Sequence, residues 1–337
     1  MILAALLIPI LHPSIFLSPY NTTEKGEWIY AGAYLKTRFT GTAATLHFDA
    51  TTNQGAPPKF RWSIDGQPLQ TAQATRTLEL AKNLPNKTHS LTLYLAASDA
   101  NYDRWNTPTQ IIRLESLELD NGATVKPPQT HKKQAIFFGD SITEGAWNLG
   151  DSFRVIDKKY VDWVQNSDAT QAWPRYLADA LKLEYGAAGS GGMGWLKTSH
   201  SNIPALPESW RFQYKNHPRN FQRNPDIIFL NMGTNDGTKD TAATVQKWLA
   251  EVHKQFPKTK VILIIPFGQQ NKSSLLAAAK SSPKTQIIDL GPAFAEGIQK
   301  YGRTTSTSHD GLHPNAGTNR RLADALQSKI RPYPALQ

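Results

Sequence analysis

The stretch Ile136-Phe137-Phe138-Gly139-Asp140-Ser141-Ile142-Thr143-Glu144-Gly145 decides the fold of this chain, because an apolar run ends there in Gly-Asp-Ser and a helix start follows. Open α/β sheets carry their chemistry at the carboxyl ends of their strands. The pattern therefore predicts a buried strand that presents Ser141 at such an end. A Gly-Asp-Ser tripeptide is a weak signal by itself, so its interpretation depends on the rest of the chain.

From residue 134 onward, apolar runs of strand length alternate with amphipathic segments of helix length. This alternation predicts a parallel sheet with helices on both faces. We expect strands at 135–138, 227–230, 261–265 and 287–290, and helices at 172–181, 241–255 and 317–329.

Residues 28–119 show a different pattern, in which apolar and polar residues alternate over short runs without helical stretches between them. Many short strands at close spacing indicate a β-sandwich. A proline-containing segment at 122–133 is typical of a linker. We therefore expect a sandwich over 21–128 and an α/β domain over 129–337, with sandwich strands at 45–49, 60–64, 91–95 and 112–119.

The segment Met1–Leu17 is apolar apart from His12 and Ser14, and two prolines interrupt it. It is too short and too broken to span a bilayer. It is similar to the apolar part of a signal peptide, although the usual positively charged start is missing. We expect residues 1–20 to be the remnant of an export signal, which implies a secreted or periplasmic protein. The alternative is an N-terminal segment packed on the fold.

The 337 residues include no cysteine, which excludes disulfides, thiolate zinc sites and a cysteine nucleophile. No histidine pair has ligand spacing on one element, and no P-loop is present, so we expect neither a metal nor another cofactor. The net charge of +10 lies mostly in residues 129–337, which carry 26 basic and 17 acidic residues, against 11 and 10 before them. Such a surface could steer an anionic polymer or be an ordinary solvated surface. Without a nucleic-acid module or a dense basic run, no nucleic-acid partner is expected.

Three further blocks follow Ser141 in an order that suits a serine esterase. A serine hydroxyl needs a base within hydrogen-bonding reach, and His313 is the candidate. Asp310 precedes it by three residues, so one turn can carry both and the carboxylate can orient the imidazole. Singly, Ser141 could be a helix N-cap, and Asp310 and His313 an ordinary turn. The blocks are Gly189–Gly194, Gly233-Thr234-Asn235-Asp236 and Asp310-Gly311-Leu312-His313.

These blocks resemble the SGNH (GDSL) hydrolase superfamily over roughly residues 134–330. The preceding sandwich resembles carbohydrate esterase family 2, on Ala33–Thr42 and Ile64-Asp65-Gly66. The resemblance implies a flavodoxin-like three-layer α/β/α domain with a parallel sheet, preceded by a smaller all-β, jelly-roll-like sandwich. Family members of this kind remove O-acetyl groups from polysaccharides with a Ser-His-Asp triad.

The resemblance also implies an oxyanion hole, which acyl transfer requires. Its donors are the backbone N–H of Ser141, the backbone N–H of Gly192 and the side-chain amide of Asn235. Gly191 competes with Gly192, because the turn has more glycines than the family pattern needs. The alternatives are a plain strand-to-helix turn and a turn asparagine. We expect Asp236 and Asp140 to be structural hydrogen-bonding residues.

Trp147 and Trp195 each follow a catalytic block by a few residues. Aromatic faces can bind sugars or acyl groups, and they are equally common as packing residues. Both tryptophans are therefore candidate substrate-binding residues. His309 has no assigned role.

The sequence favours a metal-independent carbohydrate O-acetylesterase that acts on an acetylated poly- or oligosaccharide, working as a monomer. The same triad fits a lipase, a thioesterase or an O-acyltransferase, since one fold hosts many activities. A third hypothesis is a carbohydrate-binding module attached to an inactive hydrolase domain. The basic catalytic domain favours an anionic bacterial polymer, although the polymer itself cannot be read from the sequence.

Overall fold

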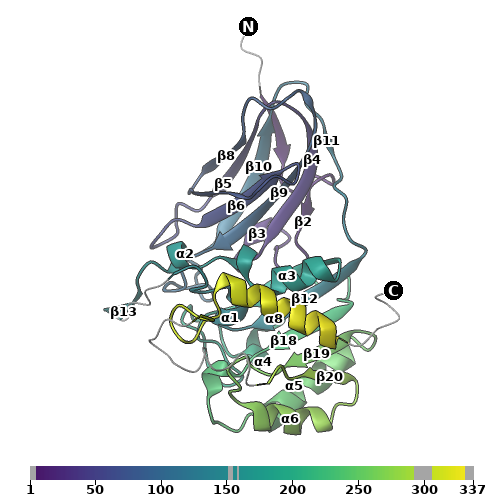
Figure 1. Cartoon of the computed structure of the whole chain (residues 1–337). Coiled ribbons are helices and arrows are strands. Elements are labelled where there is room, and N and C mark those ends of the chain that lie inside the picture. Colours follow the sequence, from purple (N-terminus) through teal and green to yellow (C-terminus); the bar gives the residue numbers. More distant parts are fainter. Residues whose placement is uncertain (1–4, 151–154, 158, 292–305, 331–337) are drawn as a thin grey trace.

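The computed structural model describes residues 5–150, 155–157, 159–291 and 306–330, and in it a β-sandwich is docked onto an α/β domain (Figure 1). Residues 1–4 of the expected export signal lie outside the described residues. Among the described residues, no helix has the length and apolarity needed to cross a bilayer.

The α/β domain is built on a five-stranded sheet in which every neighbouring pair is parallel. The order is β15-β12-β18-β19-β20, so the second strand in sequence lies on one side of the first and the remaining strands on the other. This is the flavodoxin-like order, and its topological switch point lies between β12 and β18. The predicted sheet is confirmed, with β12 at Lys133–Gly139, β15 at Leu183–Gly189, β18 at Ile227–Asn231, β19 at Lys260–Ile264 and β20 at Thr285–Ile288.

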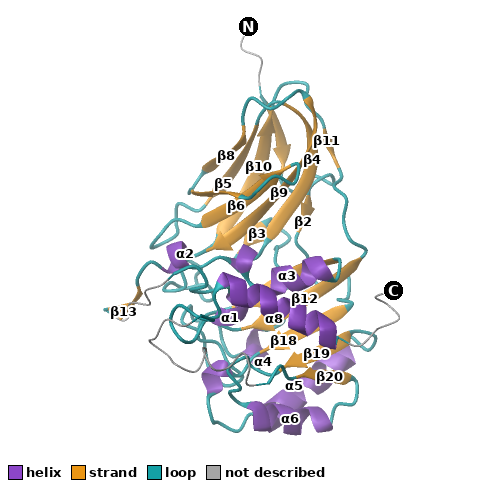
Figure 2. Ribbon diagram, viewed as in Figure 1, coloured by secondary structure: helices purple, strands orange, loops and turns teal. Residues whose placement is uncertain are grey.

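Helices cover both faces of this sheet, as Figure 2 shows. Alternate side chains of β12 point to opposite faces, so Phe137 meets Trp173 with ring centroids 5.3 Å apart, while Phe138 meets Trp248 at 6.1 Å. The first face is covered by α3 at Trp173–Ala180 and α8 at Ala316–Lys329, and the second by α5 at Ala242–Gln255 and α6 at Lys272–Lys280.

Short elements connect these larger ones, mostly near the carboxyl ends of the strands. Helix α1 follows β12 directly, and η2 follows β18. Their bounds are α1 Ser141–Glu144, β13 Val155–Ile156, β14 Lys159–Tyr160, α2 Trp163–Asn166, η1 Ala169–Gln171, α4 Leu206–Ser209, β16 Phe212–Tyr214, β17 His217–Pro218 and η2 Thr234–Asp236.

The N-terminal domain is an antiparallel sandwich of two sheets, as predicted. One sheet has the order β1-β10-β5-β8 with β3 beside β10, and the other the order β11-β4-β9-β6-β7 with β2 beside β4. Phe48 and Phe60 meet edge to face across the core, with centroids 4.9 Å apart. The strands are β1 Leu6–Pro9, β2 Phe16–Leu17, β3 Glu27–Trp28, β4 Tyr34–Gly41, β5 Ala44–Asp49, β6 Lys59–Ile64, β7 Gln70–Gln73, β8 Thr77–Ala81, β9 Lys87–Ala97, β10 Ile112–Leu119 and β11 Val125–Lys126.

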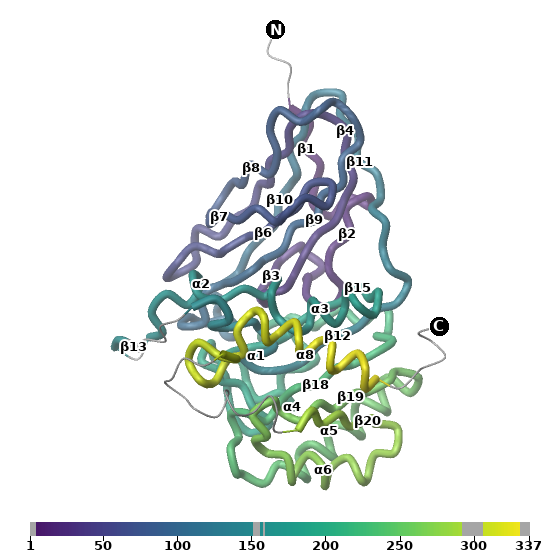
Figure 3. The backbone as a smooth tube through the Cα atoms, in the orientation of Figure 1, coloured from purple at the N-terminus to yellow at the C-terminus, as the bar shows by residue number. Residues whose placement is uncertain are grey.

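The segment expected to be an export-signal remnant contributes two strands to this sandwich (Figure 3). Leu6 of β1 pairs with Leu119, and Phe16 of β2 pairs with Lys36. The described part of the segment is therefore packed on the fold, which was the alternative interpretation. The expected linker is also shorter than 122–133, because Val125 in β11 still pairs with Phe39 and β12 begins at Lys133.

The interface between the domains is polar as well as apolar. The carboxylate of Glu184, at the start of β15, accepts hydrogen bonds from Lys36 Nζ at 2.8 Å and from Tyr34 Oη at 2.5 Å. Burial and the adjacent Glu184 raise the pKa of Tyr34 well above its usual range, so its hydroxyl stays a donor. Further along β15, a Cβ at Gly186 would overlap the carbonyl oxygen of Pro19. Close backbone approach therefore joins the two domains along β15.

We predict that Gly186→Ala destabilises the protein by about 1–3 kcal/mol, because the added methyl group forces the two backbones apart. Gly317→Ala is the matched control. Gly317 lies in α8, where the nearest atom to an added Cβ is 3.6 Å away, so alanine should stabilise by about 0.5–1 kcal/mol. Urea unfolding of the full chain measures the change in the free energy of unfolding for each variant. Equal changes in the two variants would contradict the close contact at Gly186.

Candidate active site

Ser141 is the first residue of α1, and Asp140 shapes the turn that presents it. Asp140 is the N-cap of α1, where its Oδ1 accepts the backbone N–H of Ile142 at 2.9 Å. The cap is therefore Asp140 and not Ser141, so the N-cap alternative for Ser141 is wrong. Gly145 ends the helix in the left-handed conformation, with φ of 78°. The hydroxyl of Ser141 is thus left for other partners.

Ser141, His313 and Asp310 form a continuous line of hydrogen bonds. His313 Nδ1 lies 2.6 Å from Asp310 Oδ2, and His313 Nε2 lies 2.9 Å from Ser141 Oγ. An ionised carboxylate only accepts hydrogen bonds, so Nδ1 carries the proton and Nε2 accepts from the serine hydroxyl. The structure brings together the three residues that the sequence placed in a triad, in an arrangement able to remove a proton from Ser141.

Asp310 stays ionised in this line although it is buried. Its Oδ1 accepts the backbone N–H groups of Leu312 at 2.9 Å and His313 at 2.7 Å, and the hydroxyl of Ser308 at 3.0 Å. Burial alone would raise the pKa of Asp310, but His313 and the backbone donors lower it to about 2. The carboxylate is therefore charged at neutral pH and able to stabilise a protonated imidazole.

The Gly-rich turn after β15 lies beside Ser141, and its two candidate glycines differ. The N–H of Gly191 donates to Glu144 Oε2 at 2.9 Å, so it is already bonded. Gly192 has φ of 79° and lines the same pocket as Ser141. No acceptor is found for the Gly192 N–H among the described residues. The geometry therefore favours Gly192 over Gly191 as an oxyanion donor.

Asn235 lies in η2, at the end of β18, and lines the pocket too. Its Nδ2 donates to the carbonyl oxygen of Met193 at 2.9 Å, which ties it to the Gly-rich turn. An amide nitrogen carries two protons, so one remains for a substrate. The adjacent Asp236 accepts the backbone N–H groups of Trp195 at 2.8 Å and Leu196 at 3.0 Å. Asp236 therefore has the structural place that the sequence suggested.

A pocket of about 200 Å³ opens at these groups. Beyond Ser141, His313 and the oxyanion candidates, the residues that form its walls are Tyr160, Trp163, Lys197, His200 and Leu312. The hydroxyl of Tyr160 and His200 Nε2 are joined by a hydrogen bond of 2.8 Å. Desolvation lowers the pKa of His200, and the nearby Lys197 and His313 lower it further. The pocket thus combines two aromatic rings with basic groups.

Trp147 and Trp195 do not line this pocket. Trp147 is fully buried and packs edge to face on Trp163, at 6.2 Å. Trp195 is 1% exposed, packs on Trp248 and donates from Nε1 to the carbonyl oxygen of Met232. Both tryptophans are therefore packing residues, which was the alternative to a substrate-binding role. Sequence reasoning missed Tyr160, Trp163, Lys197 and His200, since no motif marks residues that reach a pocket from very short elements and loops.

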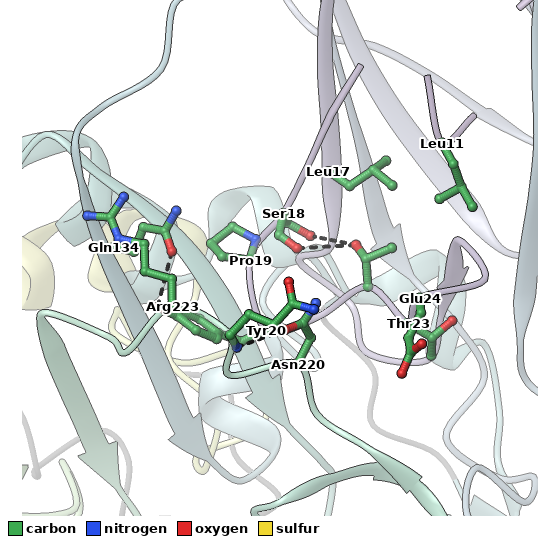
Figure 4. Close-up of a pocket in the computed structure, with 12 residues that line it drawn as sticks. Leu11, Leu17, Ser18, Pro19, Tyr20, Thr23, Glu24, Gln134, Asn220 and Arg223 are labelled. Atoms are coloured by element: carbon green, nitrogen blue, oxygen red, sulfur yellow. Dashed lines mark hydrogen bonds between the residues drawn. The ribbon is translucent and has the colours of Figure 1, made fainter. Parts of the chain in front are cut away.

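Another cavity, of about 320 Å³, lies at the domain junction and shares no lining residue with this pocket. Figure 4 shows Tyr20 lying beside Gln134 there, and the tyrosine hydroxyl donates to Gln134 Oε1 at 3.1 Å. Its lining contains no histidine, so no Ser-His pair like that of Ser141 and His313 is formed there. Within the described residues, no group of three or more His, Asp or Glu side chains is arranged to hold a metal ion.

Comparisons with known proteins agree with this fold. The model of the GDSL-like Lipase/Acylhydrolase family matches residues 137–321, and a model described as Carbohydrate esterase 2 N-terminal matches residues 20–128. No curated protein sequence matches the chain.

Many solved structures share the whole architecture. A family two carbohydrate esterase from Cellvibrio japonicus is 18% identical, with a TM-score of 0.73 and 97% of both chains covered. The acetyl xylan esterase Est2A from the rumen bacterium Butyrivibrio proteoclasticus is 15% identical, with a TM-score of 0.74 over 97% of this chain and 98% of that one. The salicylyl-acyltransferase SsfX3 from a tetracycline biosynthetic pathway is 16% identical, with a TM-score of 0.63 and 96% of both chains covered. At these identities the likeness shows the fold alone.

The turn before Ser141 yields a prediction about pH. Burial raises the pKa of Asp140 to about 6, so the folded chain holds this proton more tightly than the unfolded chain. The stability that this proton provides is full below about pH 4 and is lost as the pH rises through 6. Asp140→Asn keeps an acceptor for Ile142 N–H and removes the buried charge. At pH 8 we expect the free energy of unfolding of the variant to be up to about 3 kcal/mol higher than that of wild type, since one pKa unit corresponds to about 1.4 kcal/mol.

Urea unfolding at pH 4 and pH 8 measures this difference, which should nearly vanish at pH 4. Asp324→Asn, which removes an exposed carboxylate from α8, is the control and should show no such pH dependence. A gain from Asp140→Asn that is equal at both pH values would contradict the prediction.

Proposed function

The chain belongs to the GDSL-like lipase/acylhydrolase family, and from that premise we propose that it is a serine esterase that removes O-acetyl groups from a polysaccharide. The single observation that carries the proposal is the hydrogen-bonded line from Asp310 through His313 to Ser141. This line ends at the mouth of a small pocket, where an ester could meet the serine.

In the proposed reaction, Ser141 Oγ attacks the acetyl carbonyl carbon while His313 Nε2 takes the hydroxyl proton. The tetrahedral intermediate collapses, the bond between the carbonyl carbon and the sugar oxygen breaks, and His313 returns the proton to that oxygen. Water, deprotonated by His313, then hydrolyses the acetyl-serine and releases acetate. Asp310 holds the imidazole and stabilises its protonated form throughout. These steps need no cofactor.

The proposed oxyanion hole consists of the N–H of Ser141, the N–H of Gly192 and the side-chain amide of Asn235. These groups stem from the ends of β12, β15 and β18, three adjacent strands. Donors held by a rigid sheet need no reorganisation as charge develops on the oxygen.

The size and walls of the pocket support an acetyl rather than a long acyl group. A space of about 200 Å³ must hold the acyl group beside the reacting carbonyl, and Trp163 and Tyr160 bound it. Sugar rings commonly lie against such aromatic faces, so these two residues are our candidates for the glycan contact, in place of Trp147 and Trp195.

The sandwich takes part in shaping this cleft. Asn101, in the loop between β9 and β10, accepts the backbone N–H of Tyr160 at 2.7 Å and donates to its carbonyl oxygen at 2.8 Å. The sandwich therefore fixes one wall of the pocket. The match of residues 20–128 to the carbohydrate esterase 2 N-terminal model supports a glycan substrate. A polysaccharide substrate in turn fits an enzyme that works outside the cytoplasm, and we propose that it acts as a monomer.

The alternative is an O-acyltransferase, in which a second alcohol replaces water in the deacylation step. The similarity to a salicylyl-acyltransferase favours keeping this alternative, since that protein has the same architecture. A lipase or thioesterase activity would require space for a long acyl chain, and the small pocket does not favour it.

We predict rapid release of 4-nitrophenol from the acetate ester, with rates that fall for butyrate and octanoate. Ser141→Ala should lower kcat by at least about 10³-fold, since the nucleophile is lost. Ser328→Ala, an exposed serine of α8, is the control and should retain full activity. A chelator should have no effect.

Acetate release from acetylated xylan, mannan and bacterial polysaccharides then identifies the polymer. Preference for octanoate would replace the esterase proposal with a lipase or thioesterase. Transfer to an added sugar that outpaces hydrolysis would favour the acyltransferase. Activity that survives Ser141→Ala would remove the triad assignment.

We also predict that an anionic acetylated polymer is the better substrate. Residues 129–337 carry 26 basic and 17 acidic residues, and Lys197 stands in the pocket wall. The KM for such a polymer should rise severalfold between about 0.05 and 0.5 M salt, because salt screens charges at the surface. Lys197→Gln should raise that KM and leave the KM for 4-nitrophenyl acetate unchanged. A KM that does not change with salt would exclude electrostatic steering.

A further inference from the structure

We propose that Arg104 of the sandwich and Glu144 of α1 are positioning residues that aim the Gly192 N–H into the oxyanion site. The inference rests on the proposed function, because it concerns the oxyanion of that reaction. Neither residue lines the pocket, so neither touches the substrate. They act through the Gly-rich turn that follows β15.

Arg104 and Glu144 form a buried ion pair between the two domains. Their side chains are 0% and 2% exposed, and Arg104 Nη1 donates to Glu144 Oε1 at 2.6 Å. Arg104 Nη2 donates to the carbonyl oxygen and the hydroxyl of Ser98, at 2.8 and 2.9 Å. The sandwich thus holds the guanidinium, and the guanidinium holds one oxygen of the carboxylate.

The other oxygen of the Glu144 carboxylate binds the Gly-rich turn after β15. Oε2 accepts the N–H of Gly191 at 2.9 Å, which fixes the peptide between Ser190 and Gly191. The next peptide is fixed from its other side, because the carbonyl oxygen of Gly191 accepts the N–H of His200 at 2.9 Å. The Gly191 C=O and the Gly192 N–H belong to one planar trans peptide, so they point in opposite directions. With the carbonyl held by His200, the Gly192 N–H is directed away from His200 N.

Stability alone gives little reason for this arrangement. Burying two charges is costly, and apolar pairs of similar volume are often as stable or more so. An apolar residue at 144, however, could not accept the Gly191 N–H, which would be left unpaired in the interior. Only a carboxylate can bind both a guanidinium and that N–H through two oxygens. The pair therefore fits a role in geometry, and it makes the oxyanion site depend on the docked sandwich.

The test compares Glu144→Gln, Arg104→Met, the charge-free double variant Arg104→Met/Glu144→Met, and a control. The control is Lys36→Met, which removes another ion pair between the domains, with Glu184 at the opposite end of β15. For each variant we would measure the melting temperature, kcat and KM for 4-nitrophenyl acetate, and amide hydrogen exchange of the peptide containing 189–194.

We expect kcat to fall about 10- to 100-fold in both single variants, less than the loss of a whole oxyanion donor, with KM within threefold of wild type. Arg104→Met should also lower the melting temperature, since it leaves Glu144 buried without a partner. The double variant should regain the part of the melting temperature that the unpartnered Glu144 carboxylate costs, and it should not regain kcat. Exchange in 189–194 should rise in all three and remain unchanged in Lys36→Met, which should keep wild-type kcat.

A double variant that regains both melting temperature and kcat would overturn the proposal, because the pair would then serve stability alone. Unchanged kcat in folded Glu144→Gln would overturn it as well. A wild-type protein that hydrolyses no ester would end the proposed function instead. In that case, exchange in 189–194 still decides whether Arg104 and Glu144 hold the turn, and unchanged exchange would refute that.

Discussion

The site depends on the very close packing of α1 against the ends of β12 and β15. A Cβ at Gly139 would overlap Thr143, and a Cβ at Gly189 would come within 2.5 Å of the backbone nitrogen of Glu144. Both positions must therefore be glycine for the helix to lie on the sheet. Because α1 packs so closely on the ends of these strands, Ser141 lies at the switch point of the sheet. Glu144, one helical turn after Ser141, reaches the Gly-rich turn after β15. Ser141 and the Gly-rich turn after β15 are thus both positioned by the packing of α1 on the sheet.

Buried carboxylates surround Ser141, and their surroundings give them different properties. Asp310 and Asp140 are both removed from water, yet the pKa of Asp310 falls to about 2 while that of Asp140 rises to about 6. Asp310 has the imidazole of His313 and several hydrogen-bond donors, whereas Asp140 accepts the Ile142 N–H and is otherwise stabilised in its charged form only by Thr234 and by the charge of His313. Desolvation prevails where donors are few, and hydrogen bonding to the charged form prevails where they are many. The residue that must stay charged in the proposed reaction is the one with more partners.

The sequence predicted the elements whose apolar residues follow a regular period. The expected strands at 135–138 and 227–230 and the expected helices at 241–255 and 317–329 match observed elements within two residues at each end. Strand β15 went unpredicted, because Gly186, Ala187 and Ala188 do not resemble a buried strand. The sandwich segment at Pro19 requires glycine at 186, and α1 requires glycine at 189, and both of these contacts are tertiary. The order of the sheet followed from the resemblance and not from the periodicity.

The residues of the site also fall into two groups: those that a local sequence motif predicted and those that only the fold brings together. Ser141, Asn235, Asp310 and His313 belong to local motifs, and each lies where its motif indicated. Tyr160 lies in the two-residue strand β14, Trp163 in the one-turn helix α2 and His200 in a loop, and segments this short show no periodicity. Only the folded chain brings these residues together. Trp147 and Trp195 were predicted to bind substrate because they follow motifs closely in the sequence, yet they do not line the pocket. Nearness in sequence to a motif does not imply nearness to the pocket. Local chemistry can be read from local sequence, and the walls of a cleft cannot.

Arg104 is the clearest case of a contact that no local pattern could indicate. It lies 40 residues before Glu144, in the loop between β9 and β10 of the other domain, and nothing around it is periodic. Its guanidinium is nonetheless linked to the Gly-rich turn through a single carboxylate, that of Glu144. The loop between β9 and β10 also holds Tyr160 through Asn101, so it supports both the turn and one wall of the pocket. A sandwich that carried only a separate binding surface would need neither contact. These contacts make the two domains parts of a single site, and the pocket beside Ser141 is a property of their docking.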